Sequence, residues 1–222
     1  MTPAPLAIVQ ARIGSTRLPG KLLLDLGGKP LVWWAWNAAV QAFGLENVVV
    51  ALPASPENDE LADTIERFPA YAGNTFRRDG PENDVLGRFH ACAHRYRWHP
   101  DSVIVRVTPD DPFKIPALMW AVARGERHPV ELGGEAFTLA MLDAAHARSL
   151  GVSYYLGEPL VTSTVREHIT RALFATDPPP CPPGVWTIDT QADLDAAREL
   201  LDKSAAFKDL WATLAFDMGA QA

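Results

Sequence analysis

The sequence predicts an α/β protein with three layers, in which helices cover both faces of a mostly parallel central sheet. Short apolar runs rich in β-branched residues alternate along the chain with longer segments of helical periodicity. This alternation is typical of strand–helix–strand units, whose strands run parallel and lie buried between two helix layers. Hydrophobic residues make up 48% and charged residues 21% of the 222 residues, which indicates a folded globular chain rather than a disordered one.

In the first half of the chain, each predicted strand is an apolar run and the predicted helices have recognisable starts. Pro30 stands near the first turn of the first helix, where its fixed backbone angle is favourable. Acidic residues occupy the first turn of the second helix, where they complement the helix dipole. The predicted order is strand Pro5–Gln10, helix Pro30–Phe43, strand Asn47–Pro53, helix Pro56–Phe68, a short element around Tyr71, a polar loop, helix Asn83–Trp98 and strand Asp101–Pro112, which runs into an acidic turn.

The second half of the chain is less regular, and prolines break it at residues 177–184. Apolar residues within 207–214 form a helical stripe, which favours packing either within the chain or between the subunits of a homodimer. Because no repeat or low-complexity linker is evident, we expect a single domain over residues 1–222, with residues 128–183 as an inserted or edge subregion. The elements predicted here are helix Thr138–Ser149, helix Thr164–Phe174, strand Val185–Thr190 and helix Gln191–Asp202.

Charge and cysteine content exclude several classes of protein. The net charge is −7, so an anionic ligand can bind only where cations are gathered locally, and a nucleic-acid surface is not expected. The two cysteines, Cys92 and Cys181, lack the spacing of a zinc site, which is typical of a reduced intracellular protein. No stretch has the basic start of a signal peptide or the roughly 20 apolar residues that span a bilayer. We therefore expect a cytoplasmic protein with no membrane partner.

The loop after the first predicted strand gathers three cations, Arg12, Arg17 and Lys21, among glycines. It is not a P-loop, because five residues separate its glycines instead of four and a leucine follows Lys21 where that motif has Ser or Thr. The GxGxxG pattern of dinucleotide folds is also absent from it. A glycine-containing loop with cations and free backbone N–H groups suits an oligophosphate. The loop and the acidic turn both follow strands, and ligands of parallel sheets bind at the carboxyl ends of strands.

Four stretches carry a recognisable combination of residues: Gln10–Trp36 (QARIGSTRLPGKLLLDLGGKPLVWWAW), Gly80–Phe89 (GPENDVLGRF), Ile104–Phe113 (IVRVTPDDPF) and Thr187–Leu200 (TIDTQADLDAAREL). In this order they resemble the motifs of the cytidylyltransferases that activate acidic sugars, such as the 3-deoxy-manno-octulosonate and acylneuraminate enzymes. The chain most closely resembles the group called spore-coat polysaccharide biosynthesis protein F, and Arg166–Thr170 (REHIT) matches a segment typical of that group. The resemblance implies the Rossmann-like nucleotide-diphospho-sugar transferase fold.

The resemblance also implies ligands and residue roles. The substrates would be CTP and a sugar acceptor, with Mg²⁺ as cofactor held by Asp110 and Asp189. Carboxylates and phosphate oxygens are the ligands that this hard cation prefers. Arg12, Lys21 and Asp110 would be catalytic, since displacement at phosphorus depends mainly on positioning and on neutralising the leaving group. The implied nucleotide-binding residues are Ala11, Arg12, Gly14, Ser15 and Lys21 at the phosphates, and Asp84 and Arg88 near the ribose and base.

Two local features leave alternatives open. Asp110 follows Pro109 where the family usually has glycine and then a small residue, and it is itself followed by Asp111. Asp111 either joins the metal site or caps the following turn. His90 and His94 stand at i and i+4 on a predicted helix, as a metal-binding pair would. No third ligand is evident nearby in the sequence, which favours histidines of the surface or the core.

The acceptor is the least defined substrate. Residues 125–137 are shorter than the corresponding acceptor-binding stretch of the family, although the resemblance places the subregion 128–183 on the acceptor side. Within this subregion, Arg166 and His168 are candidates for contacts with the carboxylate of the acceptor, and a structural role for them is equally open.

The predicted function is therefore a cytidylyltransferase that transfers CMP from CTP to a sugar, expected to be acidic, with release of pyrophosphate for surface polysaccharide biosynthesis. One alternative is a nucleotidyltransferase of the same fold that uses another nucleoside triphosphate or a sugar 1-phosphate. Another is a non-catalytic or glycosyl-transferring relative that binds a nucleotide-sugar. The presence of Lys21, Asp110 and Asp189 together argues against a pure binding protein, which would not need all three.

Overall fold

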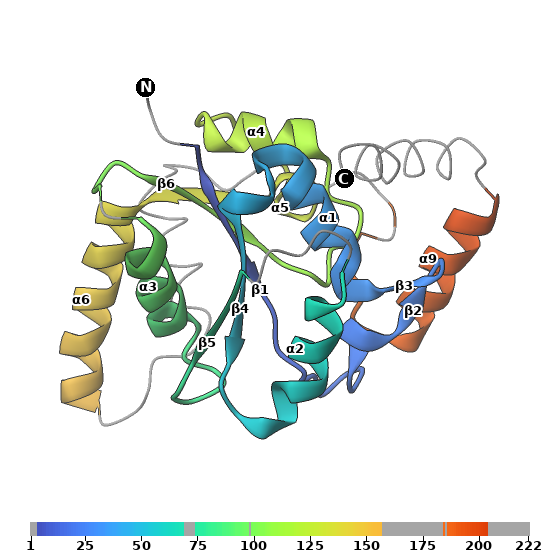
Figure 1. The fold of residues 1–222 in the computed structure, drawn as a ribbon, viewed down its shortest axis with the longest axis horizontal. Coiled ribbons are helices and arrows are strands. Elements are labelled where there is room, and N and C mark those ends of the chain that lie inside the picture. The colour runs from blue at the N-terminus through green and yellow to red at the C-terminus, as the bar shows by residue number, and fades with distance from the viewer. Residues whose placement is uncertain (1–3, 69–73, 98, 157–183, 185, 204–222) are drawn as a thin grey trace.

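A computed structural model of the chain describes residues 4–68, 74–97, 99–156, 184 and 186–203. These residues form a five-stranded central sheet with helices on both faces, which confirms the predicted α/β class (Figure 1). The strand order across the sheet is β5 (Thr75–Arg78), β4 (Val48–Pro53), β1 (Leu6–Gln10), β6 (Val103–Val107) and β7 (Glu135–Thr138). The first four are parallel, and β7 is antiparallel to β6.

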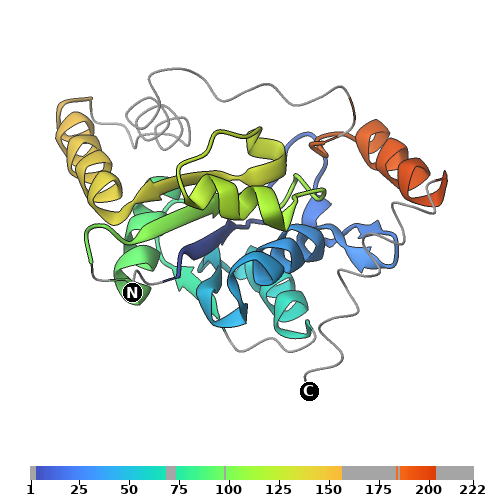
Figure 2. The same ribbon diagram turned by 90° about the horizontal axis from the view of Figure 1, so that it is seen from above.

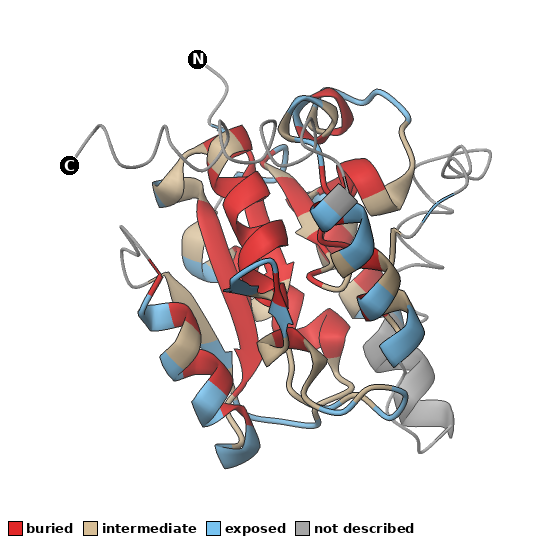
Figure 3. Cartoon of the chain, turned by 90° about the vertical axis from the view of Figure 1, so that its right-hand side faces the viewer, coloured by how far each residue is buried: buried red, intermediate tan, exposed pale blue. Residues whose placement is uncertain are grey.

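Strand β1 lies at the centre of the sheet because its residues are apolar on both faces. Residues 6–9 are 0% exposed, and Val9 pairs with Val50 of β4 on one side and with Val107 of β6 on the other. Side chains alternate between the two faces of a strand, so Ala7 and Val9 pack on one face of the sheet and Leu6 and Ile8 pack on the other. Figure 3 shows the resulting buried interior as a continuous red band of strands and helix.

Two hydrophobic cores hold the layers together, one on each face of the sheet. The view from above in Figure 2 separates the two helix layers. The predicted helices are confirmed wherever the structure describes them; α6 (Leu139–Leu156) continues seven residues beyond its predicted end, and the other ends differ by at most three. None of the described helices is long and apolar enough to cross a membrane. The first core includes residues of α1 (Leu31–Phe43), α2 (Asp59–Glu66), α4 (Pro116–Ala123) and α9 (Gln191–Lys203), and the second includes residues of α3 (Val85–Tyr96) and α6 (Leu139–Leu156).

Helix α1 is buried almost all round, because it is apolar on every side. Gln41 alone among its thirteen residues is not buried. Trp36 is 1% exposed and its ring lies 4.9 Å from that of Phe68 at the end of α2. Trp34 donates a hydrogen bond of 2.9 Å from its indole to the carbonyl of Leu26, which satisfies the polar group of this buried ring. The tryptophans of α1 are therefore core residues.

The strand predicted over residues 185–190 is wrong, because the described residues 186–190 form no strand. The backbone N–H of Ile188 donates to the carbonyl of Asp110 at 2.8 Å, and the hydroxyl of Thr187 donates to the carboxylate of Asp111 at 2.7 Å. The segment therefore crosses the carboxyl edge of the sheet and attaches to the acidic turn after β6. Its apolar residues satisfy the pattern of a strand, but its polar groups pair with that turn.

Several other elements escaped prediction, among them α4, α5 (Val130–Gly133) and β7, and two more did so for clear local reasons. β5 lies in the region predicted as a polar loop, since its sequence TFRR carries charges that an edge strand tolerates. A small hairpin of β2 (Asp25–Leu26) and β3 (Lys29–Pro30) lies within the first loop. Gly27 and Gly28 form its two-residue turn with φ of 63° and 84°, a conformation that favours glycine at both positions. The element around Tyr71, the helix over residues 164–174, most of the break at residues 177–184 and the stripe within 207–214 lie outside the described residues.

Candidate active site at the carboxyl ends of the strands

The neighbouring parallel strands β1 and β6 end at the same edge of the sheet, so the segments that follow them face each other. A pocket of about 250 Å³ lies between these segments. The structure thus brings the cation-rich loop and the acidic turn to one place, as their positions after strands predicted. The pocket is lined by Gln10, Arg12, Gly14, Ser15, Thr16, Arg17, Lys21, Leu22, Arg106, Thr108, Pro109 and Asp110, which include five of the predicted site residues.

The first loop is held by its own side chains in a form that presents backbone N–H groups. The hydroxyl of Ser15 accepts a hydrogen bond of 3.3 Å from the N–H of Leu18. The N–H of Gly14 donates to a carboxylate oxygen of Glu82 at 3.2 Å. A carboxylate is an anion, so this contact shows that the N–H of Gly14 is directed toward a position that an anionic group can occupy.

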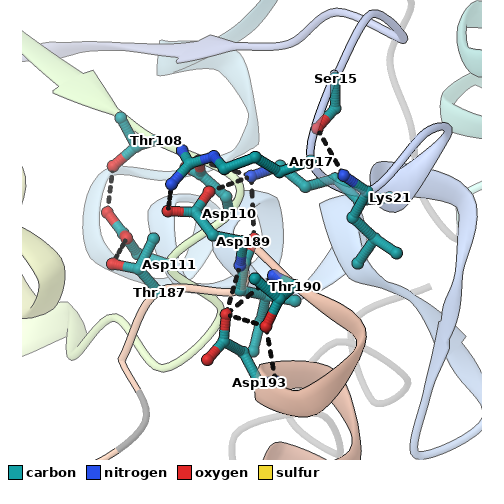
Figure 4. A network of polar contacts seen from close by, with 12 residues as sticks. Ser15, Arg17, Lys21, Thr108, Asp110, Asp111, Thr187, Asp189, Thr190 and Asp193 are labelled. Atoms are coloured by element: carbon teal, nitrogen blue, oxygen red, sulfur yellow. Dashed lines mark hydrogen bonds and ion pairs between the residues drawn. The ribbon is translucent and has the colours of Figure 1, made fainter.

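The ammonium group of Lys21 joins the loop to the two predicted metal ligands. Its Nζ lies 3.0 Å from the carboxylate of Asp110 and 2.9 Å from that of Asp189, and it donates to the carbonyl of Ile188 at 2.8 Å (Figure 4). Arg17 reaches the second oxygen of Asp189 at 2.7 Å. We call Arg17, Lys21, Asp110 and Asp189 the pocket cluster. The side chains of the two aspartates stay 29% and 23% exposed, so their carboxylates are accessible to a ligand.

Asp189 is free to face the pocket because other residues cap helix α9. Thr190 and Asp193 bond reciprocally at the start of the helix: the N–H of Thr190 donates to the Asp193 carboxylate at 2.8 Å, and the N–H of Asp193 donates to the Thr190 hydroxyl at 3.3 Å. The N–H of Asp189 donates to the same carboxylate at 3.1 Å. This arrangement is a capping box, which leaves the side chain of Asp189 for Lys21 and Arg17.

Asp111 takes neither of the two roles that the sequence left open, although it adjoins Asp110. It is 4% exposed, and its carboxylate accepts from the hydroxyls of Thr108 and Thr187 and from the ammonium of Lys114 at 3.1 Å. These donors are side chains, whereas a cap would accept from backbone N–H groups. Lys114 is itself 0% exposed. We call Thr108, Asp111, Lys114 and Thr187 the buried cluster; it ties the acidic turn to the segment before α9.

Comparison with known proteins agrees with this geometry. A protein-family model described as cytidylyltransferase matches residues 6–124, which is more than half of the chain and includes the loop and the acidic turn. The chain belongs to the cytidylyltransferase family. The 3-deoxy-manno-octulosonate cytidylyltransferase of Methylococcus capsulatus is 38% identical over 116 residues, which cover 52% of this chain and 42% of the relative. The Colwellia psychrerythraea enzyme of the same name is 35% identical over 116 residues, or 39% of its length.

Solved cytidylyltransferase structures share the fold over almost the whole chain. A cytidylyltransferase from Leptospira borgpetersenii superposes with a TM-score of 0.68 at 20% identity and covers 97% of this chain and 95% of its own. A CMP:2-keto-3-deoxy-manno-octonic acid synthetase complexed with CTP superposes with a TM-score of 0.61 at 16% identity, over 90% of this chain and 99% of its own. At such low identity these matches show the fold alone, and they confirm the fold that the family resemblance implied. The chain aligns with less than half the length of the two curated relatives.

Three of the implied nucleotide-binding residues lie outside the lining of the pocket. Ala11 is fully buried and its N–H donates to the carbonyl of Ala51 at 3.1 Å. Asp84 caps α3 by accepting from the N–H of Gly87 at 2.9 Å, and it also pairs with Arg78 at 2.6 Å. For these two residues the structure shows contacts that stabilise the backbone and the helix start.

Arg88 is the third of these residues, and it is poorly satisfied within the protein. It is 1% exposed, and its Nη1 donates to the carbonyl of Glu82 at 3.2 Å. Its Nε and Nη2 have no hydrogen-bond partner. Burial, and then repulsion from Arg12, lowers the pKa of Arg88 to about 10, so it stays protonated at neutral pH. A buried cation with unused donors beside Arg12 is suited to an anionic or carbonyl ligand.

A cation of the pocket that sequence reasoning missed is Arg106 on β6. Its Nε donates to the side-chain carbonyl of Gln10 at 2.9 Å, and its Nη1 donates to the carboxylate of Glu135 on β7. Glu135 is 7% exposed, so this ion pair holds the arginine in a fixed position at the pocket. The sequence signal that could have identified Arg106 is its position as a single charged residue in the apolar run IVRVT, where a buried charge needs a partner. Arg166 and His168, the acceptor candidates, lie outside the described residues.

Proposed function

We propose that this chain transfers CMP from CTP to a sugar hydroxyl and releases pyrophosphate, in the biosynthesis of a surface polysaccharide. The observation that carries the proposal is the pocket cluster, in which one lysine and two carboxylates converge beside a glycine-containing loop in a member of the cytidylyltransferase family. The two relatives are named 3-deoxy-manno-octulosonate cytidylyltransferases, and this name supports an acidic sugar as the acceptor.

In this proposal the loop binds the β- and γ-phosphates of CTP. The N–H of Gly14 and the hydroxyl of Ser15 lie on the loop that lines the pocket, together with the guanidinium of Arg12. Glu82 would leave the Gly14 N–H when phosphate binds, since both are anions and would compete for the same donor. Arg88 would offer its unpartnered donors to the nucleoside from the neighbouring helix.

The donor set of Asp110 and Asp189 fits Mg²⁺. Their carboxylates already converge on one cation, the Lys21 ammonium, and both remain accessible. Two carboxylates with phosphate oxygens and water complete the oxygen shell that Mg²⁺ prefers. When bound, the ion would neutralise charge on the phosphates and orient the leaving pyrophosphate. Lys21 would then exchange part of its carboxylate contacts for phosphate oxygens.

The reaction is a displacement at the α-phosphorus. The oxygen of the sugar hydroxyl forms a bond to this phosphorus as the bond from the phosphorus to the oxygen that bridges the α- and β-phosphates breaks. Pyrophosphate leaves with that oxygen, and the proton of the hydroxyl passes to water. Negative charge grows on the departing pyrophosphate, so Arg12 and Lys21 stabilise the transition state more than the ground state. Once the phosphates have displaced Glu82 and part of the carboxylate contacts of Lys21, the loop and the acidic turn hold the reacting groups in position. The acceptor roles of Arg166 and His168 and the homodimer stay predictions.

The test is nucleotide choice. With Mg²⁺ present, the chain is incubated separately with CTP, GTP, UTP and ATP, and pyrophosphate release is measured with 3-deoxy-manno-octulosonate or an acylneuraminate as acceptor. CTP at about 100 times its dissociation constant should stabilise the fold by roughly 2.7 kcal/mol. An equal or larger stabilisation by GTP or UTP would replace the cytidylyl proposal with another nucleotidyltransferase. Strong CTP binding without pyrophosphate release from any acceptor would instead indicate a nucleotide-sugar-binding protein.

A further inference from the structure

A second cluster of ligand-type side chains lies between α3 and α6, which pack side by side on one face of the sheet (Figures 1 and 2). His90 and His94 project from α3, and Asp143 and His146 project from α6. None of these four residues lines the nucleotide pocket. The i, i+4 spacing of the first two places both imidazoles on one helix face, and α6 supplies the further ligand that the sequence did not reveal.

The distances suit a single metal ion. The Nε2 atoms of His90 and His94 lie 3.2 and 2.6 Å from the same carboxylate oxygen of Asp143. The three ligand atoms all lie within 4.8 Å of one another. Tetrahedral zinc with bonds of about 2.0 Å places its ligand atoms roughly 3.3 Å apart. Only small side-chain rotations are therefore needed to bring the three atoms onto one ion.

The surroundings also favour a metal site. The side chains of His90, His94 and Asp143 are 28%, 38% and 42% exposed, so an ion can reach them from solvent. The ring of His146 stacks on that of His90 at 3.9 Å between centroids, and the ring of His94 lies at 4.5 Å from it. Three imidazole rings thus gather beside one carboxylate, and the neutral imidazole is the form that binds a divalent ion.

We propose that His90, His94 and Asp143 bind a divalent transition-metal ion of the zinc class, and that this ion links α3 to α6. Two imidazole nitrogens and one carboxylate oxygen select Zn²⁺, Co²⁺ or Ni²⁺ over Mg²⁺ and Ca²⁺, which prefer oxygen ligands alone. Water completes the fourth position. The ion bridges residues 49 apart in the sequence and stabilises the packing of α6 against the sheet.

The experiment titrates the full-length chain with ZnCl₂ by calorimetry in the absence of nucleotide, and repeats the titration with Co²⁺ to follow its visible absorption. To remove binding at the nucleotide pocket, every protein carries Asp110→Asn. We expect one equivalent of Zn²⁺ to bind, a rise in the melting temperature, and the intense absorption of tetrahedral Co²⁺. His94→Ala and Asp143→Asn should each weaken binding at least about tenfold.

His99→Ala is the matched control, because His99 is an exposed histidine on the loop after α3, where its Nδ1 accepts from the N–H of Asp101 at 3.2 Å and contacts no residue of the proposed site. It should bind Zn²⁺ as the parent protein does. Since loss of the His94–Asp143 contact can lower the melting temperature by itself, the shift caused by the metal is compared within each variant, and His90→Gln provides a second, milder ligand change. Absence of Zn²⁺ binding in the parent protein, or unchanged binding in the His94 and Asp143 variants, would overturn the proposal.

Discussion

The pocket cluster and the buried cluster each pair a lysine with aspartate and meet at consecutive residues, Asp110 and Asp111, yet these ion pairs differ in exposure. In the pocket cluster the carboxylates are 23–29% exposed and share Lys21. In the buried cluster the carboxylate is 6% and Lys114 0% exposed, and two threonine hydroxyls complete the bonding. The first cluster can exchange partners with a ligand. In the second cluster the charged groups, Asp111 and Lys114, are buried, and each of them depends on a protein partner.

The difference shows how one short turn serves both chemistry and stability. Successive side chains of the turn point to opposite sides, one toward the pocket and the other toward the interior (Figure 4). A buried charge without its partner is costly, whereas an accessible charge can be solvated or bound by ligand. Substitutions in the two clusters should therefore separate a loss of folding stability from a loss of activity. The following predictions are ordered from the largest expected change in free energy to the smallest.

Asp111→Ala should have the largest effect, and it should act on stability. It leaves the ammonium of Lys114 buried without a carboxylate, although the carbonyl of Val130 still accepts from it at 3.0 Å. Breaking a buried pair in this way costs about 3–5 kcal/mol. Urea unfolding measures it. Asp59→Ala, which removes an exposed partner of Arg77, is the control and should change stability by less than about 1 kcal/mol. A similar small loss for Asp111→Ala would show that the buried cluster is dispensable.

Lys21→Ala should act mainly on turnover. Loss of a preorganised cation at the leaving pyrophosphate lowers turnover by about 100- to 1,000-fold, or roughly 2.7–4 kcal/mol of barrier. The apo fold should survive, because water reaches the carboxylates of Asp110 and Asp189. Pyrophosphate release and apo melting are measured together. Lys29→Ala removes a lysine that lies over the ring of Trp33 at 5.3 Å and should keep normal turnover. Near-normal release by the Lys21 variant would make the loop a structural element only.

Asp189→Asn should weaken the response to Mg²⁺ and lower turnover at least about tenfold, or roughly 1.4 kcal/mol of barrier. Two neighbouring carboxylates repel each other, and by itself this repulsion predicts that apo stability stays unchanged or rises slightly when one is removed. The structure alters that expectation, since Lys21 and Arg17 both pair with Asp189 and the repulsion is already compensated. A small decrease in apo stability is expected instead. Full activity of the Asn variant, at any Mg²⁺ concentration, would end the proposed metal role.

Arg17→Ala should have the smallest effect on the apo protein. The side chain of Arg17 is 66% exposed, and its pair with Asp189 is a surface ion pair worth about 0–1 kcal/mol. The variant should melt near the parent temperature, while its KM for CTP rises and becomes less sensitive to salt because one cation of the pocket is lost. A loss of stability comparable to that of Asp111→Ala would contradict the division between an accessible and a buried cluster.

Much of the fold could be predicted because its signals are local. Strand β1 and helix α1 are continuous apolar segments with clear ends, and each was predicted to within one residue. The edge strand β5 could not be predicted in this way, since an edge position tolerates the charges of TFRR. Residues 186–190 have the composition of a strand, and only their bonds to the acidic turn direct them away from the sheet.

The sequence by itself determined the α/β alternation, the cation-rich loop after β1 and the acidic turn after β6, because each depends on neighbouring residues. The tertiary structure alone decided which of Asp110 and Asp111 faces the pocket, that Arg106 joins the pocket through Glu135, and that Asp143 lies beside His90 and His94. These outcomes depend on contacts between residues far apart in the chain, such as the 89 positions between Lys21 and Asp110. Burial and partner distance, which set the free energy of a charge, exist only once those segments have packed together.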